Sequence, residues 1–315
     1  MPIVIEASQI THRYRGQGRD EPAAVQGIDL QIPEGRLYGL IGPDGAGKTT
    51  LIRILATVLT PASGLARISG FDTVRQAEAA RATFGYMPQV FSLYPDMSVL
   101  ENLRFFADVN GVPRLRQKPR MDELLEFARL TEFTSRRSEN LSGGMRKKLA
   151  LACALVHEPR ILLLDEPTTG VDPVSRRELW LLLARVVQQG VTVLVSTPYM
   201  DEAERCNVVG ILDRGRLLIT GAPAELEAQL PFQVVEVKAR PRRTLRQVVA
   251  QTEGILAWRA VGDRLRLSVR NPEEVQRRLA KQLEESGAAT SILRTARPTM
   301  EDVFIHNVEN GPATS

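Results

Sequence analysis

The sequence is poor in cysteine, histidine and aromatic residues. Of its 315 residues, two are cysteines, three are histidines and 5% are aromatic. Cys153 and Cys206 lie far apart and form no CxxC pattern. The sequence therefore predicts neither a disulfide framework nor a zinc site, and it favours a reducing compartment.

A long hydrophobic run is absent as well. The longest stretch without a charged residue is Val186–Met200, and Gln188, Gln189 and Gly190 interrupt it. A membrane helix needs about 20 mostly apolar residues, and a signal peptide needs a basic segment followed by an apolar one. We therefore predict no membrane span and no signal peptide. We expect a cytoplasmic protein that associates peripherally with the cytoplasmic face of a membrane.

Neither sign of charge dominates. Lys and Arg total 41 and Asp and Glu total 37, which gives a net charge of +4, while 43% of the residues are hydrophobic and 25% are charged. These values are typical of a soluble globular protein, and they argue against a basic nucleic-acid-binding tail. At roughly 150 residues per domain, the length predicts about two domains.

The first two thirds of the chain alternate between apolar strand segments and helical segments. Short apolar runs rich in β-branched residues occur at Ile161–Asp165, Val191–Ser196 and Asn207–Asp213, which is the pattern of parallel strands covered on both faces. From Ser92 to Asn140 the apolar residues recur at helical spacing instead. We predict an α/β domain over residues 4–228, with a helical subdomain at about 90–155.

The pattern changes after Leu230. The remaining segments follow the order β-α-β-β-α-β, with a hairpin turn at Gly262-Asp263 and a last helix after Thr299. This order is typical of a small ferredoxin-like fold. We predict a second, accessory α+β domain over residues 229–315. Its expected role is dimer stabilisation or regulation, and the alternative is a passive folding cap.

A glycine-rich loop follows the apolar strand Leu37–Ile41 and precedes a helical segment. It fits the pattern G-x-x-x-x-G-K-[ST], in which backbone amides bind phosphates, the lysine reaches the β- and γ-phosphates, and the hydroxyl binds Mg²⁺. The alternative is a tight glycine turn before a helix. The predicted nucleotide-binding residues of the loop are Gly42, Pro43, Asp44, Gly45, Ala46, Gly47, Lys48, Thr49 and Thr50.

Two acidic residues stand at the end of the apolar strand Ile161–Asp165. Asp165 can deliver a carboxylate to the Mg²⁺ next to the glycine loop. Glu166, one residue later, is placed to polarise an attacking water. Taken alone, these residues would favour solvated acids at a strand end, but here they follow a phosphate loop at a plausible distance.

The ordered set of motifs resembles the ATPase subunit of an ABC transporter. After the glycine loop come Gln89 in FGYMPQ, then LSGGM, ILLLDEP and Asp172 in GVDP, within about residues 4–228. The resemblance implies a P-loop ABC ATPase fold that binds ATP and Mg²⁺ and pairs head to tail, as a homodimer or a heterodimer. It also implies that Gln89 contacts the metal and the water, and that Asp172 lies at the dimer interface. Tyr14 would stack on adenine, although a strand-edge aromatic is the alternative.

The signature segment comprises Leu141, Ser142, Gly143, Gly144 and Met145. In the family that this chain resembles, the segment caps the ATP bound to the partner chain. Ser142 and the glycine amides would open a helix, and a helix N-terminus presents N–H donors and partial positive charge to a γ-phosphate. Met145 replaces the usual glutamine. Because the phosphate-facing donors remain, we expect a mild effect.

One position departs from the family's pattern. The family places a histidine that contacts the γ-phosphate after the strand following ILLLDEP, whereas this sequence has Pro198 and no histidine nearby. Proline has no side-chain donor and no N–H, but it suits the first turn of a helix, here one capped by Ser196 or Thr197. Loss of one preorganised donor lowers a rate by roughly a hundred- to a thousandfold. We therefore expect this ATP site to bind well and to hydrolyse slowly.

The leading hypothesis is an ATP-hydrolysing motor subunit of an ABC exporter of the drug or multidrug type. The segment after Gln89 and the C-terminal RPTMEDVFI resemble that branch, in which a separate membrane subunit, the permease, docks on the helical stretch. The alternatives are a soluble ABC ATPase that acts on ribosomes or DNA, and a regulatory nucleotide binder that does not hydrolyse. No nucleic-acid partner is predicted for the exporter subunit.

Overall fold

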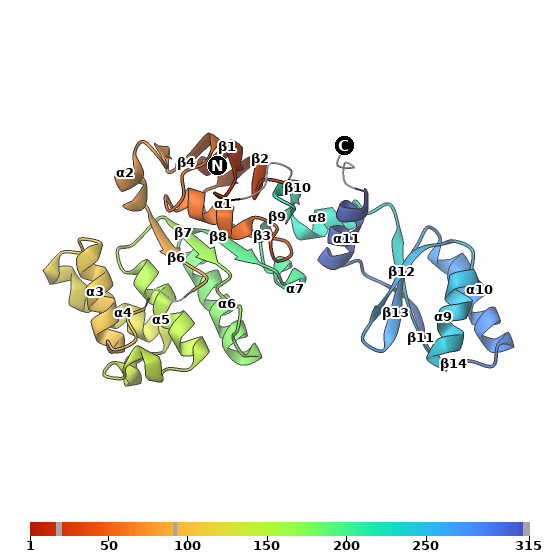
Figure 1. Ribbon diagram of the computed structural model, residues 1–315. Coiled ribbons are helices and arrows are strands. Elements are labelled where there is room, and N and C mark those ends of the chain that lie inside the picture. Colours follow the sequence, from red (N-terminus) through yellow and green to blue (C-terminus); the bar gives the residue numbers. More distant parts are fainter. Residues whose placement is uncertain (17–20, 91–92, 311–315) are drawn as a thin grey trace. The chain divides into compact units, whose positions relative to one another are not determined.

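The computed structural model describes residues 1–16, 21–90 and 93–310 (Figure 1). They form two compact units, of which the first is Met1–Pro223 and the second begins at Ala224. The boundary expected from the sequence, near residue 228, falls at the last residue of helix α8 (Pro223–Ala228). Residues 311–315 of the predicted accessory domain and residues 91–92 of the predicted helical subdomain lie outside the described residues.

A six-stranded sheet forms the middle of the first unit. In its order β10-β9-β3-β8-β7-β6, the strands from β9 to β6 pair in parallel, and β10 pairs antiparallel with β9. Every residue of β3 and β7 is buried, as expected of parallel strands covered on both faces. The predicted apolar strands are thus confirmed. The strands are β3 (Leu37–Ile41), β6 (Phe84–Met87), β7 (Ile161–Asp165), β8 (Thr192–Thr197), β9 (Val208–Asp213) and β10 (Arg216–Gly221).

A second, antiparallel sheet of order β2-β1-β4-β5 packs against the first. Apolar residues of β1 and β2, such as Ile5 and Ile28, share one buried cluster with Leu40 and Leu163 of the parallel sheet. Burial of this apolar surface is the main force that holds the two sheets together. The strands are β1 (Ile3–His12), β2 (Val25–Pro33), β4 (Ser63–Ile68) and β5 (Phe71–Asp72).

A group of helices lies at one end of the first unit (Figure 1). The group confirms the predicted helical character of this stretch, but α4 begins well before the apolar repeat that starts at Met121, and it contains Pro119. Its first turns are mostly exposed and therefore leave no apolar repeat in the sequence. The group comprises α3 (Val99–Val109), α4 (Arg114–Ala128), η1 (Thr131–Phe133), η2 (Ser138–Asn140) and α5 (Gly143–Leu155). The other helices of this unit are α1 (Lys48–Leu55), α2 (Ala77–Arg81), α6 (Pro173–Gln188) and α7 (Met200–Ala203).

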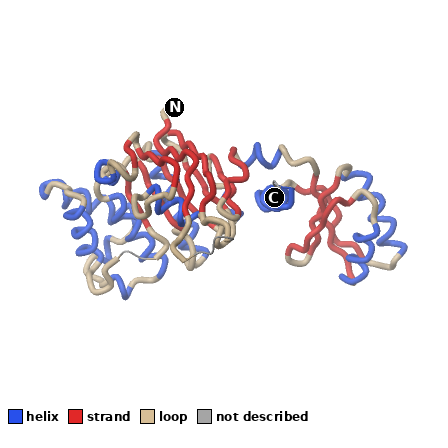
Figure 2. The backbone as a smooth tube through the Cα atoms, turned by 45° about the horizontal axis from the view of Figure 1, so that its top comes forward, coloured by secondary structure: helices blue, strands red, loops and turns tan. Residues whose placement is uncertain are grey.

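The second unit is an antiparallel sheet with α9 and α10 packed on one face (Figure 2). The strand order is β12-β13-β11-β14, and the face with Val235, Val237 and Leu267 packs on α9 and α10. The predicted order β-α-β-β-α-β is confirmed. The elements are β11 (Gln233–Arg240), α9 (Arg242–Gln251), β12 (Ile255–Val261), β13 (Arg264–Val269), α10 (Pro272–Glu285), β14 (Ala289–Ala296) and α11 (Met300–Asn310). Across the described ranges, no helix has the length and apolar character needed to cross a membrane.

Candidate functional site

The predicted phosphate loop lies between β3 and α1 and borders a cavity of about 680 Å³. Residues 44–50 of the loop line this cavity together with Tyr14, Gln89 and Glu166. Because β6, β7 and β3 run parallel, the segments that follow them emerge at the same edge of the sheet. The cavity therefore lies where a parallel α/β sheet usually binds its ligand.

The glycine at position 47 is required by the backbone of the loop. Gly47 has φ of +104°, and a Cβ at this position would lie 2.3 Å from the carbonyl oxygen of Ala24. Any side chain here would force the loop away from that neighbouring backbone. The tight loop brings Lys48 inward, where its Nζ donates to the carbonyl oxygens of Gly42 at 2.8 Å and Pro43 at 3.0 Å.

Two oxygen-bearing side chains meet beside the loop. The hydroxyl of Thr49 donates to Oδ1 of Asp165 at 2.9 Å, and the other oxygen, Oδ2, is buried with no partner among the described residues. Burial raises the pKa of Asp165, although hydrogen bonds from Ser196 and Thr49 oppose that rise. Hard oxygen ligands are the ones that Mg²⁺ prefers. The pair fits a Mg²⁺ site.

Glu166 lies at the centre of the cavity wall and is only 4% exposed. Its Oε1 is 3.4 Å from Nζ of Lys48, and its Oε2 accepts hydrogen bonds from Gln89 Nε2 at 2.9 Å and from the Thr169 hydroxyl at 3.2 Å. The backbone of Glu166 has φ of +47°, a left-handed conformation that is uncommon for a residue with a side chain and that recurs at functional sites. The structure thus brings three predicted site residues, Lys48, Gln89 and Glu166, into contact.

Tyr14 lies on the cavity wall beyond the end of β1 and is 38% exposed. Its hydroxyl is 3.0 Å from the hydroxyl of Thr50, and its ring meets the ring of His12 edge-on with centroids 5.0 Å apart. An exposed, supported aromatic ring beside a phosphate loop provides a stacking surface for a flat group.

The signature segment stands at the start of α5. Ser142 is the N-cap of this helix, and its hydroxyl oxygen accepts the amide of Met145 at 3.2 Å. A Cβ on Gly144 would lie 2.2 Å from the Ser175 hydroxyl of α6, so a glycine is required for the close packing of the two helices. These residues and Leu141, which is buried, are absent from the lining of the nucleotide cavity within the described ranges.

Asp172 and Pro198 also lie outside the lining of that cavity as far as the structure describes it. Asp172 is the exposed N-cap of α6 and accepts the amides of Val174 and Ser175, at 3.1 Å and 3.0 Å. The backbone hydrogen bond from Ser175 is the first cause of its lowered pKa.

Pro198 does not stand in the first turn of a helix, so that prediction is wrong. Helix α7 begins at Met200, after Tyr199 as its N-cap. Neither predicted capping side chain caps it, because Ser196 bonds to the strand-end acids and the Thr197 hydroxyl accepts the amide of Tyr199.

Sequence reasoning missed two residues that support the acidic pair. The Ser196 hydroxyl donates to Asp165 Oδ1 at 2.8 Å and accepts the amide of Glu166 at 3.0 Å. Asp165 and Ser196 are partners in the parallel pairing of β7 with β8. Aligning these two predicted strands is the step that could have identified Ser196. Lys147 of α5 is buried, and its Nζ donates to the backbone oxygens of Gln89 at 3.3 Å and Glu166 at 3.4 Å. Burial lowers its pKa.

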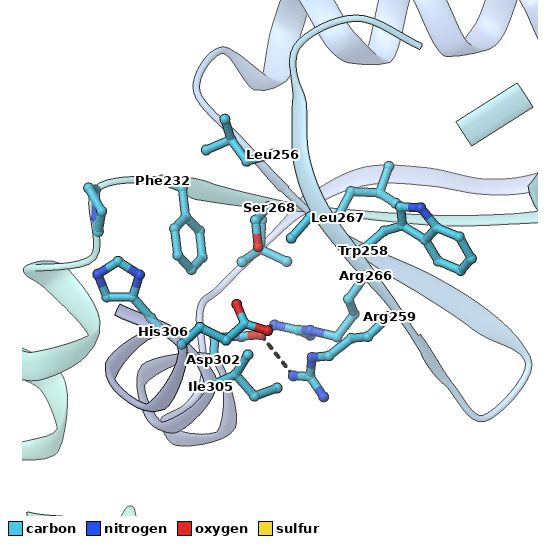
Figure 3. Close-up of a pocket in the computed structure, with 14 residues that line it drawn as sticks. Phe232, Leu256, Trp258, Arg259, Arg266, Leu267, Ser268, Asp302, Ile305 and His306 are labelled. Atoms are coloured by element: carbon cyan, nitrogen blue, oxygen red, sulfur yellow. Dashed lines mark hydrogen bonds and ion pairs between the residues drawn. The ribbon is translucent and has the colours of Figure 1, made fainter. Parts of the chain in front are cut away.

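A second cavity, of about 510 Å³, lies in the C-terminal unit between α11 and the sheet (Figure 3). Phe232 and Trp258 give it aromatic walls. Its basic groups pair with acids, since Asp302 accepts from Arg259 at 2.8 Å and from Arg266 at 2.9 Å. The cavity therefore offers mainly aromatic and apolar surface rather than a charged site.

Glu236 lies on the same sheet, at the centre of a cluster of arginines. Its carboxylate accepts from Arg264 at 3.0 Å, from Arg266 at 2.9 Å and from Arg294 at 3.0 Å. Burial alone would raise the pKa of Glu236, but hydrogen bonds from Arg294 and Arg264 and the charge of Arg266 hold it below its ordinary value. The cluster is an electrostatic support for the second unit.

Comparison with known proteins assigns the first unit to a family. A family model described as ABC transporter matches residues 25–169. The chain is 50% identical over 212 residues to the probable multidrug ABC transporter ATP-binding protein YbhF of Escherichia coli K12. That match covers 67% of this chain but 36% of YbhF, so the chain spans about a third of that relative's length.

Another relative matches over nearly its whole length. The chain is 38% identical to the Nod factor export ATP-binding protein I of Cupriavidus metallidurans, over 89% of this chain and 91% of that protein. Among solved structures, a dimeric post-hydrolysis state of the ATP-binding cassette MJ0796 bound to ADP and Pi superposes with a TM-score of 0.63 at 26% identity, over 69% of this chain and 98% of that one.

These matches and the phosphate loop define a P-loop nucleotide-binding protein of mixed α/β fold. The chain belongs to the ABC transporter family.

Proposed function

We propose that this chain binds ATP with Mg²⁺ in the cavity of the first unit, hydrolyses it and thereby drives export through a separate membrane subunit. The observation that carries the proposal is that Lys48, Thr49, Gln89 and Glu166 line one cavity and that Asp165 bonds to Thr49 beside it. Phosphoryl transfer needs little beyond positioning and charge stabilisation, and these groups provide both. The exporters named for the relatives support an export role.

Each residue in the cavity has a proposed task. Lys48 and the loop amides hold the phosphates, and Tyr14 stacks on adenine. Thr49, Asp165 and Gln89 hold Mg²⁺, which when bound neutralises phosphate charge. Glu166 accepts a proton from the attacking water, and Gln89, already bonded to its Oε2, orients that water.

The signature segment and Asp172 act in trans in this proposal. Two copies, or this chain and a second ATPase chain, pair head to tail so that LSGGM of one covers the ATP of the other. Support comes from the Ser142 hydroxyl, whose oxygen already accepts the Met145 amide and whose proton remains available for a phosphate. Asp172 is exposed at the start of α6, where a partner can reach it.

A groove of about 500 Å³ is the proposed docking surface for the permease. It is lined by the end of α1, by β6 and by α3 and α5, and Val58 and Val109 on its rim are 57% and 66% exposed. Because Gln89 lies two residues after the end of β6, movement of the groove can reach the nucleotide site. The chain would therefore work at the cytoplasmic face of a membrane.

The C-terminal unit is proposed to be a ferredoxin-like accessory domain that stabilises the dimer or regulates it. Its element order and its strand order β14-β11-β13-β12 support that assignment. We further propose that the ATP site on this chain is slow, since Pro198 supplies no donor where the family uses a histidine.

ATPase assays of the purified protein with Mg²⁺ test these proposals. Glu166→Gln should abolish turnover while a fluorescent ATP analogue still binds. Turnover faster than that of Glu166→Gln is expected of the wild type, and its absence would refute the ATPase assignment. Pro198→His should raise turnover by about a hundredfold. Pro198→Ala is the matched control, because it removes proline without adding a donor. Equal rates for wild type and Pro198→His would refute the slow-site proposal.

A regulatory nucleotide binder is the second candidate, and Pro198 is the observation that favours it. It predicts tight ATP binding with turnover no faster than that of Glu166→Gln, whether the chain is alone or in membranes that contain its permease. Recovery of the tagged chain with a membrane subunit supports export, and recovery with ribosomes would instead indicate a non-transport ABC ATPase.

A further inference from the structure

The carboxylate of Glu202 joins three segments of the first unit. Glu202 is fully buried, with 0% exposure. Its Oε2 accepts from the hydroxyls of Thr168, at 3.1 Å, and Thr197. Its Oε1 accepts from Arg176 Nε at 2.6 Å and from Trp180 Nε1 at 3.0 Å. One buried side chain thus takes hydrogen bonds from the segment after β7, from α6 and from the end of β8.

Each of these segments carries a residue of the proposed ATPase site. Thr168 lies two residues after Glu166, and Arg176 lies one turn after Asp172, the N-cap of α6. The third partner, Thr197, is the last residue of β8 and directly precedes Pro198. Glu202 itself lies in the short helix that follows. The segments that carry the proposed general base Glu166, the interface residue Asp172 and Pro198 are therefore all tethered to a single carboxylate.

The turn that contains Pro198 is fixed from both sides. The Thr197 hydroxyl accepts the amide of Tyr199 at 3.1 Å while it donates to Glu202. Arg176 lies over the ring of Tyr199 at 4.4 Å and bonds both carboxylate oxygens of Asp201, each at 3.0 Å. A proline cannot hold this turn through its own side chain, and the neighbouring residues hold it instead.

A buried carboxylate is costly unless charge and hydrogen bonds compensate it. Here Arg176 provides the charge, and three neutral donors occupy the remaining positions. Two of those donors, the threonines, belong to the chain segments that carry the chemistry. Fold stability alone would be served as well by an apolar side chain of similar volume, so the choice of a multiply bonded carboxylate points to positioning.

We propose that Glu202 is a positioning residue for the ATPase site. It locks the Pro198 turn and the start of α6 to the segment that carries Glu166, so that a shift of one is transmitted to the others. This inference rests on the proposed ATPase function. The residues that hold ATP are not bonded to Glu202, so ATP affinity stays independent of it.

The test compares two donors to the same carboxylate. Thr168→Val removes the link to the Glu166 segment, whereas Trp180→Phe removes one of two donors from α6 and leaves Arg176, the donor nearer Asp172, to tether the start of that helix. Misplacement of a reacting group by about 1 Å lowers a rate by about a hundredfold. Thr168→Val should therefore lower kcat by about ten- to a hundredfold with KM for ATP within about twofold. Trp180→Phe should lower the urea midpoint by about as much as Thr168→Val does, and it should leave kcat within about threefold of the wild-type value. Equal kcat values for the two variants would overturn the proposal.

Hydrogen exchange by mass spectrometry gives a readout that does not depend on turnover. Thr168→Val should raise amide exchange in both residues 166–172 and residues 197–203, because the tether between them is cut. An increase confined to residues 166–172 would show that the segments are independent and would overturn the proposal. Failure of the ATPase function would appear separately, as wild-type turnover equal to that of Glu166→Gln.

Discussion

Replacement of Ser196 by alanine should destabilise the first unit strongly, although the substitution removes only one hydroxyl group. That hydroxyl accepts the Glu166 amide and donates to Asp165 Oδ1, and Ser196 is fully buried. An unsatisfied buried N–H costs about 1–3 kcal/mol, and a lost hydrogen bond to a charged group costs about 1.5–3 kcal/mol. The other oxygen of Asp165, Oδ2, already has no partner among the described residues. The carboxylate therefore has few other hydrogen bonds to offset the one lost from Ser196. The expected loss is about 2–5 kcal/mol in the free energy of unfolding.

Urea unfolding followed by tryptophan fluorescence measures this loss. The chain has two tryptophans, and a Trp258→Phe background leaves Trp180, which is buried in the first unit, as the reporter. With a slope of about 2–3 kcal/mol/M, the midpoint should fall by about 0.7–2.5 M. Ser63→Ala, at an exposed residue of β4, is the matched control and should shift the midpoint by about 0.2 M or less. A Ser196→Ala midpoint equal to that of the control would refute the reasoning.

Three further predictions follow from the same contacts. Asp172→Ala should lower the urea midpoint through the lost helix cap, while Asp172→Asn should keep most of the stability; equal urea midpoints for the two variants would contradict this. The lowered pKa of Glu236 means that its cluster stabilises the second unit above the unfolded pKa of about 4.5 and that this stabilisation is lost as pH falls through the folded pKa. Glu236→Gln should therefore weaken the dependence of the stability of the second unit on pH in the acid range, with unfolding followed by the fluorescence of Trp258. A pH dependence parallel to that of the wild type would count against the argument. Lys48→Ala should weaken binding of a fluorescent ATP analogue by at least about tenfold, and an unchanged Kd would exclude its phosphate role.

Local patterns in the sequence predicted the strands, the phosphate loop and the element order of the second unit, because each depends on residues close together along the chain. The Pro198 turn was not predictable in this way. Its conformation depends on Thr197, whose hydroxyl bonds to Tyr199 and Glu202, and on donors from distant segments. The supporting role of Ser196 depends on strand pairing with Asp165, which the sequence does not display. Contacts between distant segments decide these features, and a single sequence carries no direct record of them.

The close packing of α5 on α6 has a consequence for any chain that binds to this one. Gly144 and Ser175 approach so closely that a single methyl group at position 144 would collide. The first turns of the two helices, which begin after Ser142 and Asp172, are therefore meshed and move together. A partner chain therefore contacts the two helix N-termini as one packed surface rather than as two independent sites. A larger residue at position 144 would be tolerated only if the side chain at position 175 became smaller. The two positions are therefore expected to vary as a pair.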